Sequence, residues 1–204
     1  MSSLAIFASG SGSNFISIFH QISIGEIKAK VCLFITDNSN AKALEFAKSK
    51  NIPSYVLDVN MKKYSQKVLE LLENNKINLI VLAGYLKLVP KIIVDKFENK
   101  IINIHPALLP SFGGKGYYGL KVHKEVIDSG VKKTGVTIHY VNSNYDQGQI
   151  IVQKTINVLP EDTHITLAKK VLNIEHQLYP FVLKAICEDR IDWINGKPWI
   201  IAAN

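Results

Sequence analysis

Apolar runs alternate with amphipathic segments through the first half of the chain. Short runs rich in β-branched residues predict strands, and segments in which apolar residues recur with a helical period predict helices. Strands are expected at residues 4–8, 31–36, 54–57, 79–83 and 101–105, and helices at residues 15–24, 41–50, 63–74 and 92–97. This alternation indicates a mainly parallel sheet with helices on both faces.

The pattern changes after about residue 110. Residues 111–118 are rich in glycine and aromatic residues and predict a loop, and helices are expected at residues 120–129 and 164–187. Alternating runs at residues 134–141 and 149–158 predict an antiparallel strand pair. We therefore expect an α/β fold with a Rossmann-like, mainly parallel open sheet, helices on both faces and an antiparallel carboxyl-terminal strand pair.

Size and composition suit a single domain of residues 1–204. Hydrophobic residues make up 47% of the chain and charged residues 20%, which is typical of a globular protein and excludes the disordered class. No apolar run approaches the roughly 20 residues that span a bilayer, and the first residues lack a signal-peptide pattern. The two cysteines form no disulfide or metal motif. We expect a cytoplasmic protein that binds no membrane.

The net charge of +7 is spread along the chain rather than gathered in one segment. The lysine pairs at 48/50, 62/63, 132/133 and 169/170 are far apart in sequence, and no nucleic-acid-binding signature accompanies them. We expect no nucleic-acid partner. A lysine-rich surface is the first explanation of the charge, and an anionic small substrate is the second.

Two polar residues interrupt the apolar strand at residues 101–105. Asn103 and His105 are two positions apart, so they point to one face at the strand's carboxyl end, where Pro106 stops the ladder. Ligands of open α/β sheets bind outside the carboxyl ends of the strands. An amide beside an imidazole suggests a carbonyl-polarising donor next to a proton carrier. A strand end with two locally satisfied polar groups is an equally open interpretation.

A glycine-rich turn at residues 9–14 follows the first strand and precedes a helix. In this arrangement backbone N–H groups and the helix dipole bind an anion, and Ser13 or Asn14 can cap the helix. A dinucleotide site is the rival interpretation, because Asp37 follows the second strand. Its fingerprint requires a third glycine where this chain has Phe15. A single phosphate fits better.

Other chemistry-bearing positions are less specific on the sequence alone. Asp146 is the only carboxylate in the loop at residues 142–148, where an aspartate more often forms a turn. His139 lies on the alternating strand before that loop, so facing the site and a structural polar role are both open, and we favour the structural role. Lys170 and Glu175 are five positions apart on the last helix, so periodicity does not require them to share a face.

Five segments in order resemble the phosphoribosylglycinamide formyltransferases over about residues 4–190. They are residues 9–14, 81–85, 103–110, 145–148 and 175–180. The Asn-x-His-Pro segment with a later Asp-x-Gly marks formyltransferases generally, and the serine-rich glycine loop and the Glu-His-x-x-Tyr-Pro helix are narrower. The resemblance implies formylation of glycinamide ribonucleotide in purine synthesis, with 10-formyltetrahydrofolate as co-substrate.

The resemblance also implies residue roles. It makes Asn103, His105 and Asp146 a catalytic triad, residues 1–100 a phosphate-binding half and residues 101–204 a catalytic and folate-binding half. It places the ribonucleotide phosphate on Gly12, Ser13 and Asn14, with help from Lys170, and puts Glu175 on the substrate side. It places the folate on Asn103 and the following further residues: Leu86, Lys87, Leu88, Val89, Val141 and Asn142.

The sequence departs from the family pattern in three places. The family often has Ser-Arg-Glu-x-Tyr before its third helix, whereas residues 60–64 read Asn-Met-Lys-Lys-Tyr, so Lys62 is the candidate to replace the folate-side arginine. The loop after Pro110 is longer, with residues 113–116 inserted. Gln147 stands where the family has a glycine after the aspartate.

The expected mechanism follows from these residue types. Asn103 donates to the oxygen that gains negative charge when the substrate amine attacks the formyl carbon. His105, as an imidazolium, stabilises this charge and protonates the departing folate nitrogen. For that role its pKa should be raised, which an ionised Asp146 nearby would do. The histidines show no metal-site spacing, so we expect no metal.

Several other functions remain open at this point. Methionyl-tRNA formyltransferase has a further carboxyl-terminal domain and formyltetrahydrofolate hydrolase an amino-terminal one, and the length of this chain argues against both. A nicotinamide-dependent oxidoreductase and a non-catalytic nucleotide-binding module are more distant alternatives. The oligomeric state, including a homodimer, is not determined by the sequence.

Overall fold

The computed structural model describes residues 1–202. It contains a seven-stranded sheet in the order β3-β2-β1-β4-β5-β6-β7 and a separate two-stranded sheet, β8-β9. The chain divides into two compact units, residues 1–103 and residues from 104 onward, and strand β5 contributes its last two residues to the second unit. The mainly parallel sheet with an antiparallel carboxyl-terminal pair confirms the predicted fold class.

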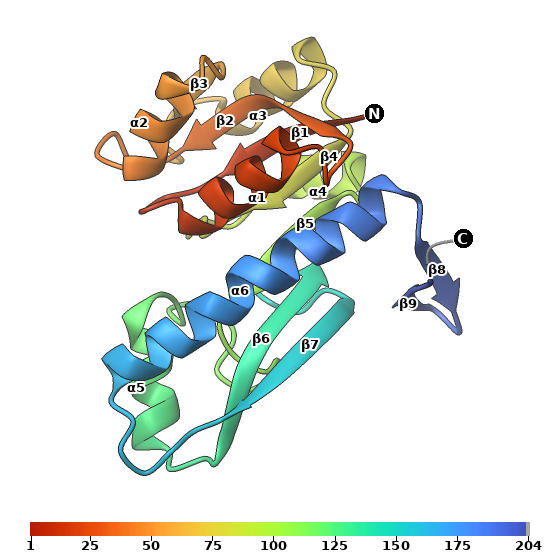
Figure 1. Ribbon diagram of the computed structural model, residues 1–204. Helices are drawn as coiled ribbons and strands as arrows, with labels where there is room; N and C mark the ends of the chain where they lie inside the picture. The colour runs from red at the N-terminus through yellow and green to blue at the C-terminus, as the bar shows by residue number, and fades with distance from the viewer. Residues whose placement is uncertain (203–204) are drawn as a thin grey trace. The chain divides into compact units, whose positions relative to one another are not determined.

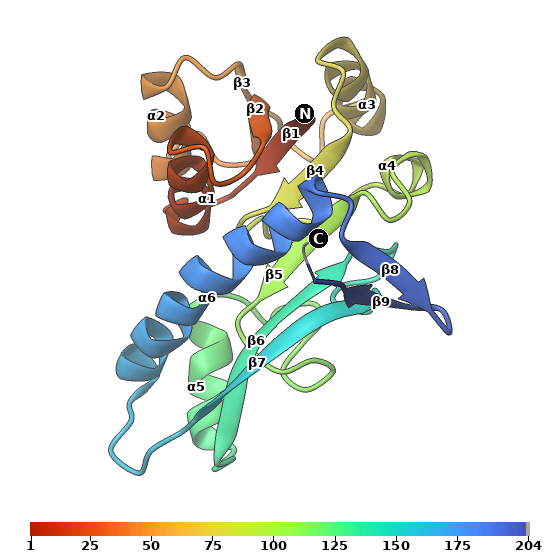
Figure 2. The same cartoon turned by 45° about the vertical axis from the view of Figure 1, so that its right-hand side comes forward.

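The first unit is a doubly wound parallel sheet. Its strands are β1 (Ser2–Phe7), β2 (Ala29–Thr36), β3 (Ser54–Val56), β4 (Leu79–Leu82) and most of β5 (Ile101–His105), all paired in parallel. Its helices are α1 (Ser13–Ser23), α2 (Lys42–Ser49), α3 (Tyr64–Asn74) and α4 (Lys91–Lys96). Figure 2 shows α1 and α2 on one side of the strands and α3 and α4 on the other. The continuous apolar runs form strands because helices cover both faces.

The second unit packs two helices against an antiparallel pair. Strand β6 (Lys133–Tyr140) pairs with β7 (Ile150–Asn157), and helix α6 (His164–Cys187) contacts both strands and helix α5 (Leu120–Asp128) (Figure 1). Every residue of β6 after Lys133 is buried. None of the helices in residues 1–202 combines the length and hydropathy needed to cross a bilayer.

The β6–β7 ladder has an irregularity next to the loop that carries Asp146. Ile138 is opposite Val152, but the next residue, His139, is opposite Ile150, so Ile151 has no single partner in the register. A bulge of this kind bends the strand and changes the direction of nearby side chains. His139 therefore lies at a point where the two strands do not follow regular geometry.

A second hairpin was not predicted. Strands β8 (Ile191–Ile194) and β9 (Lys197–Ile200) pair antiparallel through Asn195 and Gly196, which both have positive φ angles of 52° and 71°. Asn-Gly at these two positions is the preferred sequence of a type I′ hairpin turn, so the sequence carried a signal for this element.

The side-chain caps expected for helix α1 are wrong. Helix α1 is capped by Gly12 in the left-handed conformation, and α2 by Ala41 without a side-chain hydrogen bond, so neither Ser13 nor Asn14 acts as a cap. The chain enters α1 through a tight turn that only glycine adopts readily. Thr163 caps α6 through a reciprocal pair of hydrogen bonds with Thr166.

The β6–β7 pairing leaves no room for a side chain at Gly135. A Cβ atom there would lie 2.0 Å from the Lys154 carbonyl oxygen of the paired strand. We expect Gly135→Ala to lower the free energy of unfolding by about 2–3 kcal/mol, the usual cost of overpacking a rigid site. Urea unfolding measures this, with Gly10→Ala as the control because a Cβ there would have no neighbour within 4 Å. Equal stability of both variants would contradict the close approach.

Candidate active site

His105 ends strand β5 and is held at both ring nitrogens. Its side chain is buried, with 4% exposed, and its Nε2 lies 2.8 Å from the Phe112 carbonyl oxygen. Its Nδ1 lies 3.6 Å from Oδ2 of Asp146. A carbonyl oxygen can only accept, so Nε2 carries a hydrogen and donates it. The ring therefore presents Nδ1 to the carboxylate.

Asp146 lies in the loop after β6, with a left-handed backbone at φ 54°. Its carboxylate is 12% exposed, and Oδ2 accepts a hydrogen bond of 2.9 Å from the Gly114 N–H. The segment after Pro110 therefore contacts both members of the pair, through the Phe112 carbonyl and the Gly114 amide. Neither group was predicted from the sequence, although the two glycines at 113 and 114 marked a segment that could approach closely.

His139 contacts Asp146 as well, so its side chain faces the His105–Asp146 pair. Its Nε2 lies 3.6 Å from Oδ1 of Asp146, and its Nδ1 lies 2.7 Å from the carbonyl oxygen of Tyr140. Strand β6 is buried on both faces, so alternation of apolar and polar residues could not tell which way His139 points. Each oxygen of the Asp146 carboxylate therefore faces one imidazole ring.

The expectation of a raised pKa for His105 is wrong. Burial lowers the pKa of His105 below its usual value and outweighs the opposing effects of Asp146 and of the Phe112 carbonyl, while the charge of His139 lowers it further. Burial raises the pKa of the Asp146 carboxyl, but the His139 side chain, the charge of His105 and the Gly114 N–H together hold it below its usual value. The pair is therefore arranged for an ionised Asp146 and a largely neutral His105 at pH 7.

Two side chains fix the chain immediately after His105. The Thr137 hydroxyl donates to the Ala107 carbonyl oxygen at 2.7 Å and accepts from the Leu109 N–H at 3.0 Å. The Gln153 amide nitrogen donates to the Thr137 hydroxyl and to the Leu109 carbonyl oxygen. Strands β6 and β7 thereby position the end of β5 and the turn that follows it.

Asn103 is the last residue of the first unit. It precedes His105 by two positions on strand β5, and alternation along a strand places the two side chains on the same face. The Asn103 side chain is half-buried. Alternation thus still predicts that its amide and the His105 ring leave the strand in the same direction.

In the first unit the side chain of Ser9 holds the glycine turn in place by hydrogen bonds. Its hydroxyl donates to Oδ1 of Asp37 at 2.5 Å and accepts from the Leu86 N–H at 3.0 Å. The other Asp37 oxygen lies 3.5 Å from Nζ of Lys87. The aspartate that favoured a dinucleotide is thus engaged with protein groups, and the turn after β4 is tied to the glycine turn.

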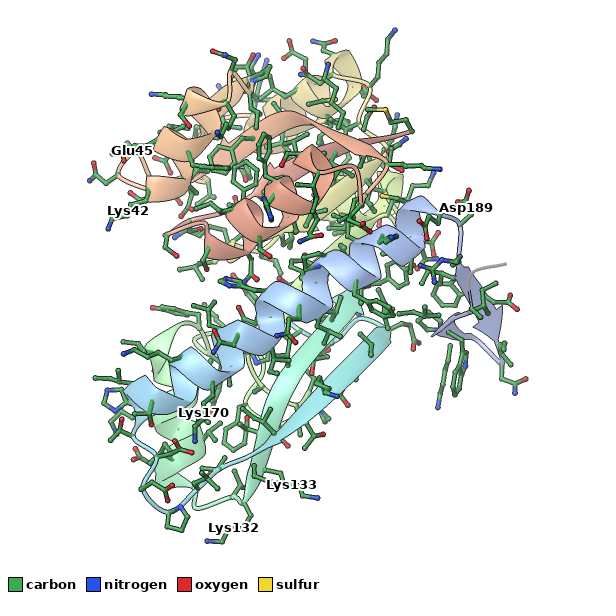
Figure 3. The ribbon with its side chains drawn as sticks, viewed as in Figure 1. Lys42, Glu45, Lys132, Lys133, Lys170 and Asp189 are labelled. Atoms are coloured by element: carbon green, nitrogen blue, oxygen red, sulfur yellow. The ribbon has the colours of Figure 1, made fainter. Side chains whose placement is uncertain are left out.

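The remaining predicted substrate residues differ in their surroundings. Gly12 begins α1 with φ 75°, and Asn14 is buried in its first turn. Lys170 on α6 (Figure 3) pairs with Asp162, 2.7 Å away, so its ammonium already has a carboxylate partner. Glu175 is buried on the same helix.

The residues predicted for the folate are mostly loop residues that follow strands. Leu86 and Leu88 are 42% and 41% exposed after β4, whereas Val89 is buried. Val141 and Asn142 are half-buried directly after β6, and Lys62 is exposed before α3. No group of histidine, cysteine, aspartate or glutamate side chains within residues 1–202 has the arrangement of a metal site.

Comparison with known families assigns the class of protein. The family model for formyl transferases matches residues 2–183. That range contains the β5 strand with Asn103 and His105, the Asp146 loop and most of α6. The chain thus contains a formyl transferase domain.

Individual relatives define the family more narrowly. The chloroplastic phosphoribosylglycinamide formyltransferase of Arabidopsis thaliana is 45% identical over 195 residues, which are 93% of this chain and 67% of that protein. The Bacillus subtilis enzyme of the same name is 36% identical over 190 residues, 91% of this chain and 95% of that one. The crystal structure of glycinamide ribonucleotide transformylase 1 from Symbiobacterium toebii superposes with a TM-score of 0.90 at 31% identity, covering 99% and 95% of the two chains. The chain belongs to the phosphoribosylglycinamide formyltransferases, which are formyl transferases of purine biosynthesis.

The start of α1 predicts a difference between two glycine variants. Gly12 and Gly25 both have positive φ, at 75° and 83°, but a Cβ on Gly12 would lie 2.6 Å from Cβ of Ala43, whereas Gly25 has open space. We expect Gly25→Ala to cost about 1 kcal/mol from backbone strain. Gly12→Ala should cost a further 1–3 kcal/mol, roughly, because α2 must move. Chemical unfolding of both variants measures the difference, and equal losses would contradict the α1–α2 contact.

His123 on α5 predicts a pH dependence of stability. Burial, followed by the charges of His105 and His164, lowers its pKa to about 4, and its Nδ1 has no hydrogen-bond partner within residues 1–202. Between about pH 6.5 and 4 the unfolded chain binds a proton that the folded chain does not, so stability falls as the pH falls. We expect His123→Gln to reduce this slope by up to about 1.4 kcal/mol per pH unit.

Urea unfolding at several pH values between 4.5 and 7 measures that slope. The exposed His20 supplies the control, because His20→Gln should leave the pH dependence of wild type unchanged. A slope in His123→Gln as steep as that of wild type would show that His123 does not cause it.

Proposed function

We propose that this chain transfers the formyl group of 10-formyltetrahydrofolate to the amino group of 5'-phosphoribosylglycinamide. The observation that carries the proposal is the buried His105–Asp146 pair at the carboxyl end of β5, with Asn103 on the same strand face. Membership of the formyl transferase family and the names of its relatives support the same chemistry.

Asn103, His105 and Asp146 have different roles in the proposed reaction. The Asn103 amide donates a hydrogen bond to the formyl oxygen as negative charge develops there, an interaction whose loss typically costs ~10²–10³ in rate. His105 handles the proton, and such general acid–base help contributes ~10²–10⁴-fold. Asp146 orients the His105 ring and stabilises its charged form.

The lowered pKa of His105 favours a neutral ring at the start of the reaction. The lone pair of the neutral ring is on Nδ1, which faces Asp146, so the ring must turn out of this arrangement before it takes the proton of the attacking amine. The imidazolium then donates that proton to the departing folate nitrogen. One proton is taken up and one released, so His105 returns to its first state. This sequence replaces the expectation that His105 begins as an imidazolium.

The residues available for the folate fit a partly apolar ring system. Leu86 and Leu88 expose apolar surface after β4, and Lys87, Val89, Val141, Asn142 and Lys62 complete the proposed set. The folate supplies the activated formyl group, and these residues hold its pterin end. Asn103 contributes from strand β5.

The ribonucleotide phosphate is assigned to the start of α1. Gly12, Ser13 and Asn14 lie at the positive end of the helix dipole, where an anion is stabilised. We also propose that Glu175 binds the ribonucleotide substrate. Lys170 has to leave or share its Asp162 partner to help with the phosphate.

Absorbance-monitored formyl transfer tests the proposal. The wild-type chain is mixed with a 10-formylated folate, with and without glycinamide ribonucleotide. We expect folate release that depends strictly on the ribonucleotide. Release without an acceptor would instead identify a hydrolase, and no release would overturn the proposed transfer.

Two variants test the residue assignment in the same assay. We expect His105→Ala and Asp146→Asn to lower kcat by about 10²-fold or more, with little change in substrate binding. His20→Ala and Asp128→Asn are matched controls on exposed positions and should retain wild-type turnover. Near-normal turnover in both active-site variants would refute their roles.

A further inference from the structure

Asp146 has a second imidazole partner that the proposed mechanism does not use. Oδ2 faces Nδ1 of His105 at 3.6 Å, and Oδ1 faces Nε2 of His139 at the same distance. Both rings belong to the second unit and are almost fully buried, with 4% and 2% of their side chains exposed. A single carboxylate therefore serves two imidazoles.

The backbone fixes the tautomer of each ring. Nδ1 of His139 lies 2.7 Å from the Tyr140 carbonyl oxygen, and Nε2 of His105 lies 2.8 Å from that of Phe112. Each of these nitrogens must carry a hydrogen, because a carbonyl oxygen only accepts. In its neutral form each ring would then turn a lone pair towards Asp146.

This geometry couples the protons of the two rings. Two neutral rings would set two lone pairs against a carboxylate, which is repulsive. Two charged rings would place like charges around one carboxylate in a poorly solvated region. One extra proton, on either ring, gives Asp146 a cationic partner without that repulsion. Groups this close titrate as a set rather than singly.

We propose that His139 is a positioning residue that shares Asp146 with His105. It keeps the carboxylate oriented and compensated while His105 passes through its neutral state. The inference rests on the proposed function, because it takes His105 and Asp146 as the reacting pair.

The surroundings of the two rings support this sharing. The charge of His139 is among the causes that lower the pKa of His105, and the His139 side chain helps to lower that of Asp146. Outside the cluster, the charge of His105 lowers the pKa of His123 on α5, after burial and together with the charge of His164 on α6. The irregular register at His139 is the kind of backbone feature that redirects a side chain beside a reactive site.

Two substitutions separate the position of His139 from its charge. In His139→Asn the amide reaches only the place of Nδ1, so the Tyr140 bond can persist while the contact with Asp146 is lost. In His139→Gln the amide reaches the place of Nε2 and offers Asp146 a neutral donor. We expect His139→Asn to lower kcat about tenfold with KM within about threefold, and His139→Gln to restore most of kcat.

The titration of His105 provides a readout that needs no activity. In ring-labelled protein followed by NMR, we expect the midpoint of His105 to rise by about 0.5–1 pH unit in both variants, because a neighbouring positive charge has gone. The direction follows from the sign of that charge, which opposes protonation of His105. His20→Gln is the control and should leave the midpoint and kcat unchanged.

Wild-type protein alone gives a second test, should either variant fail to fold. The His105 curve should depart from that of a single isolated group, because the two rings share one carboxylate. A wild-type curve that fits a single isolated group, or a midpoint that stays within about 0.2 pH unit in folded variants, would overturn the sharing. Wild-type protein that transfers no formyl group would overturn the proposed function instead, and the titrations would still decide whether the rings share Asp146.

Discussion

The side chain of Asp146 is only 12% exposed, so groups from several parts of the second unit must compensate its carboxylate. An ionised group with so little water is stable only when donors and positive charge surround it. The Gly114 amide and the two imidazoles provide these, and each element that carries one is fixed in turn. Strand β6 carries His139, and Thr137 from the same strand holds the turn after His105. Asp146 itself has a left-handed backbone, with φ 54°.

In the first unit a small number of contacts holds the glycine turn next to the loop after β4. Asp37 could have served a ribose hydroxyl, but Ser9 and Lys87 occupy its oxygens. Ser9 also accepts from Leu86, so the glycine turn and the loop after β4 are held by one hydroxyl. Both loops follow the carboxyl ends of neighbouring parallel strands, where an α/β sheet presents its ligands. The hydroxyl of Ser9 and the carboxylate of Asp37 thus hold together the two loops that we propose bind the substrates.

The sequence predicted the strands and helices of both units because their apolar patterns are strong, and Asn103 and His105 because a polar pair is unusual in a buried strand. It did not predict which way the His139 side chain points, because β6 is buried on both faces and its residue pattern therefore does not distinguish them. It could not predict the Phe112 and Gly114 contacts, which come from backbone groups with no residue-specific signal. The direction in which the pKa of His105 is shifted could not be predicted either, because it depends on whether burial or the nearby charges have the larger effect. The β8–β9 hairpin, by contrast, was readable from Asn195-Gly196 and was overlooked.

That hairpin has a practical consequence for optical experiments. The chain has two tryptophans, and both lie in it: Trp193 on β8 and Trp199 on β9. The indole of Trp193 stacks on the ring of Tyr140, with centroids 5.6 Å apart, and Tyr140 supplies the carbonyl that holds His139. Indole emission from this protein therefore originates entirely in one corner of the second unit. It therefore reports on the folding of the part of the second unit around the hairpin, and it does not detect unfolding that is confined to the first unit.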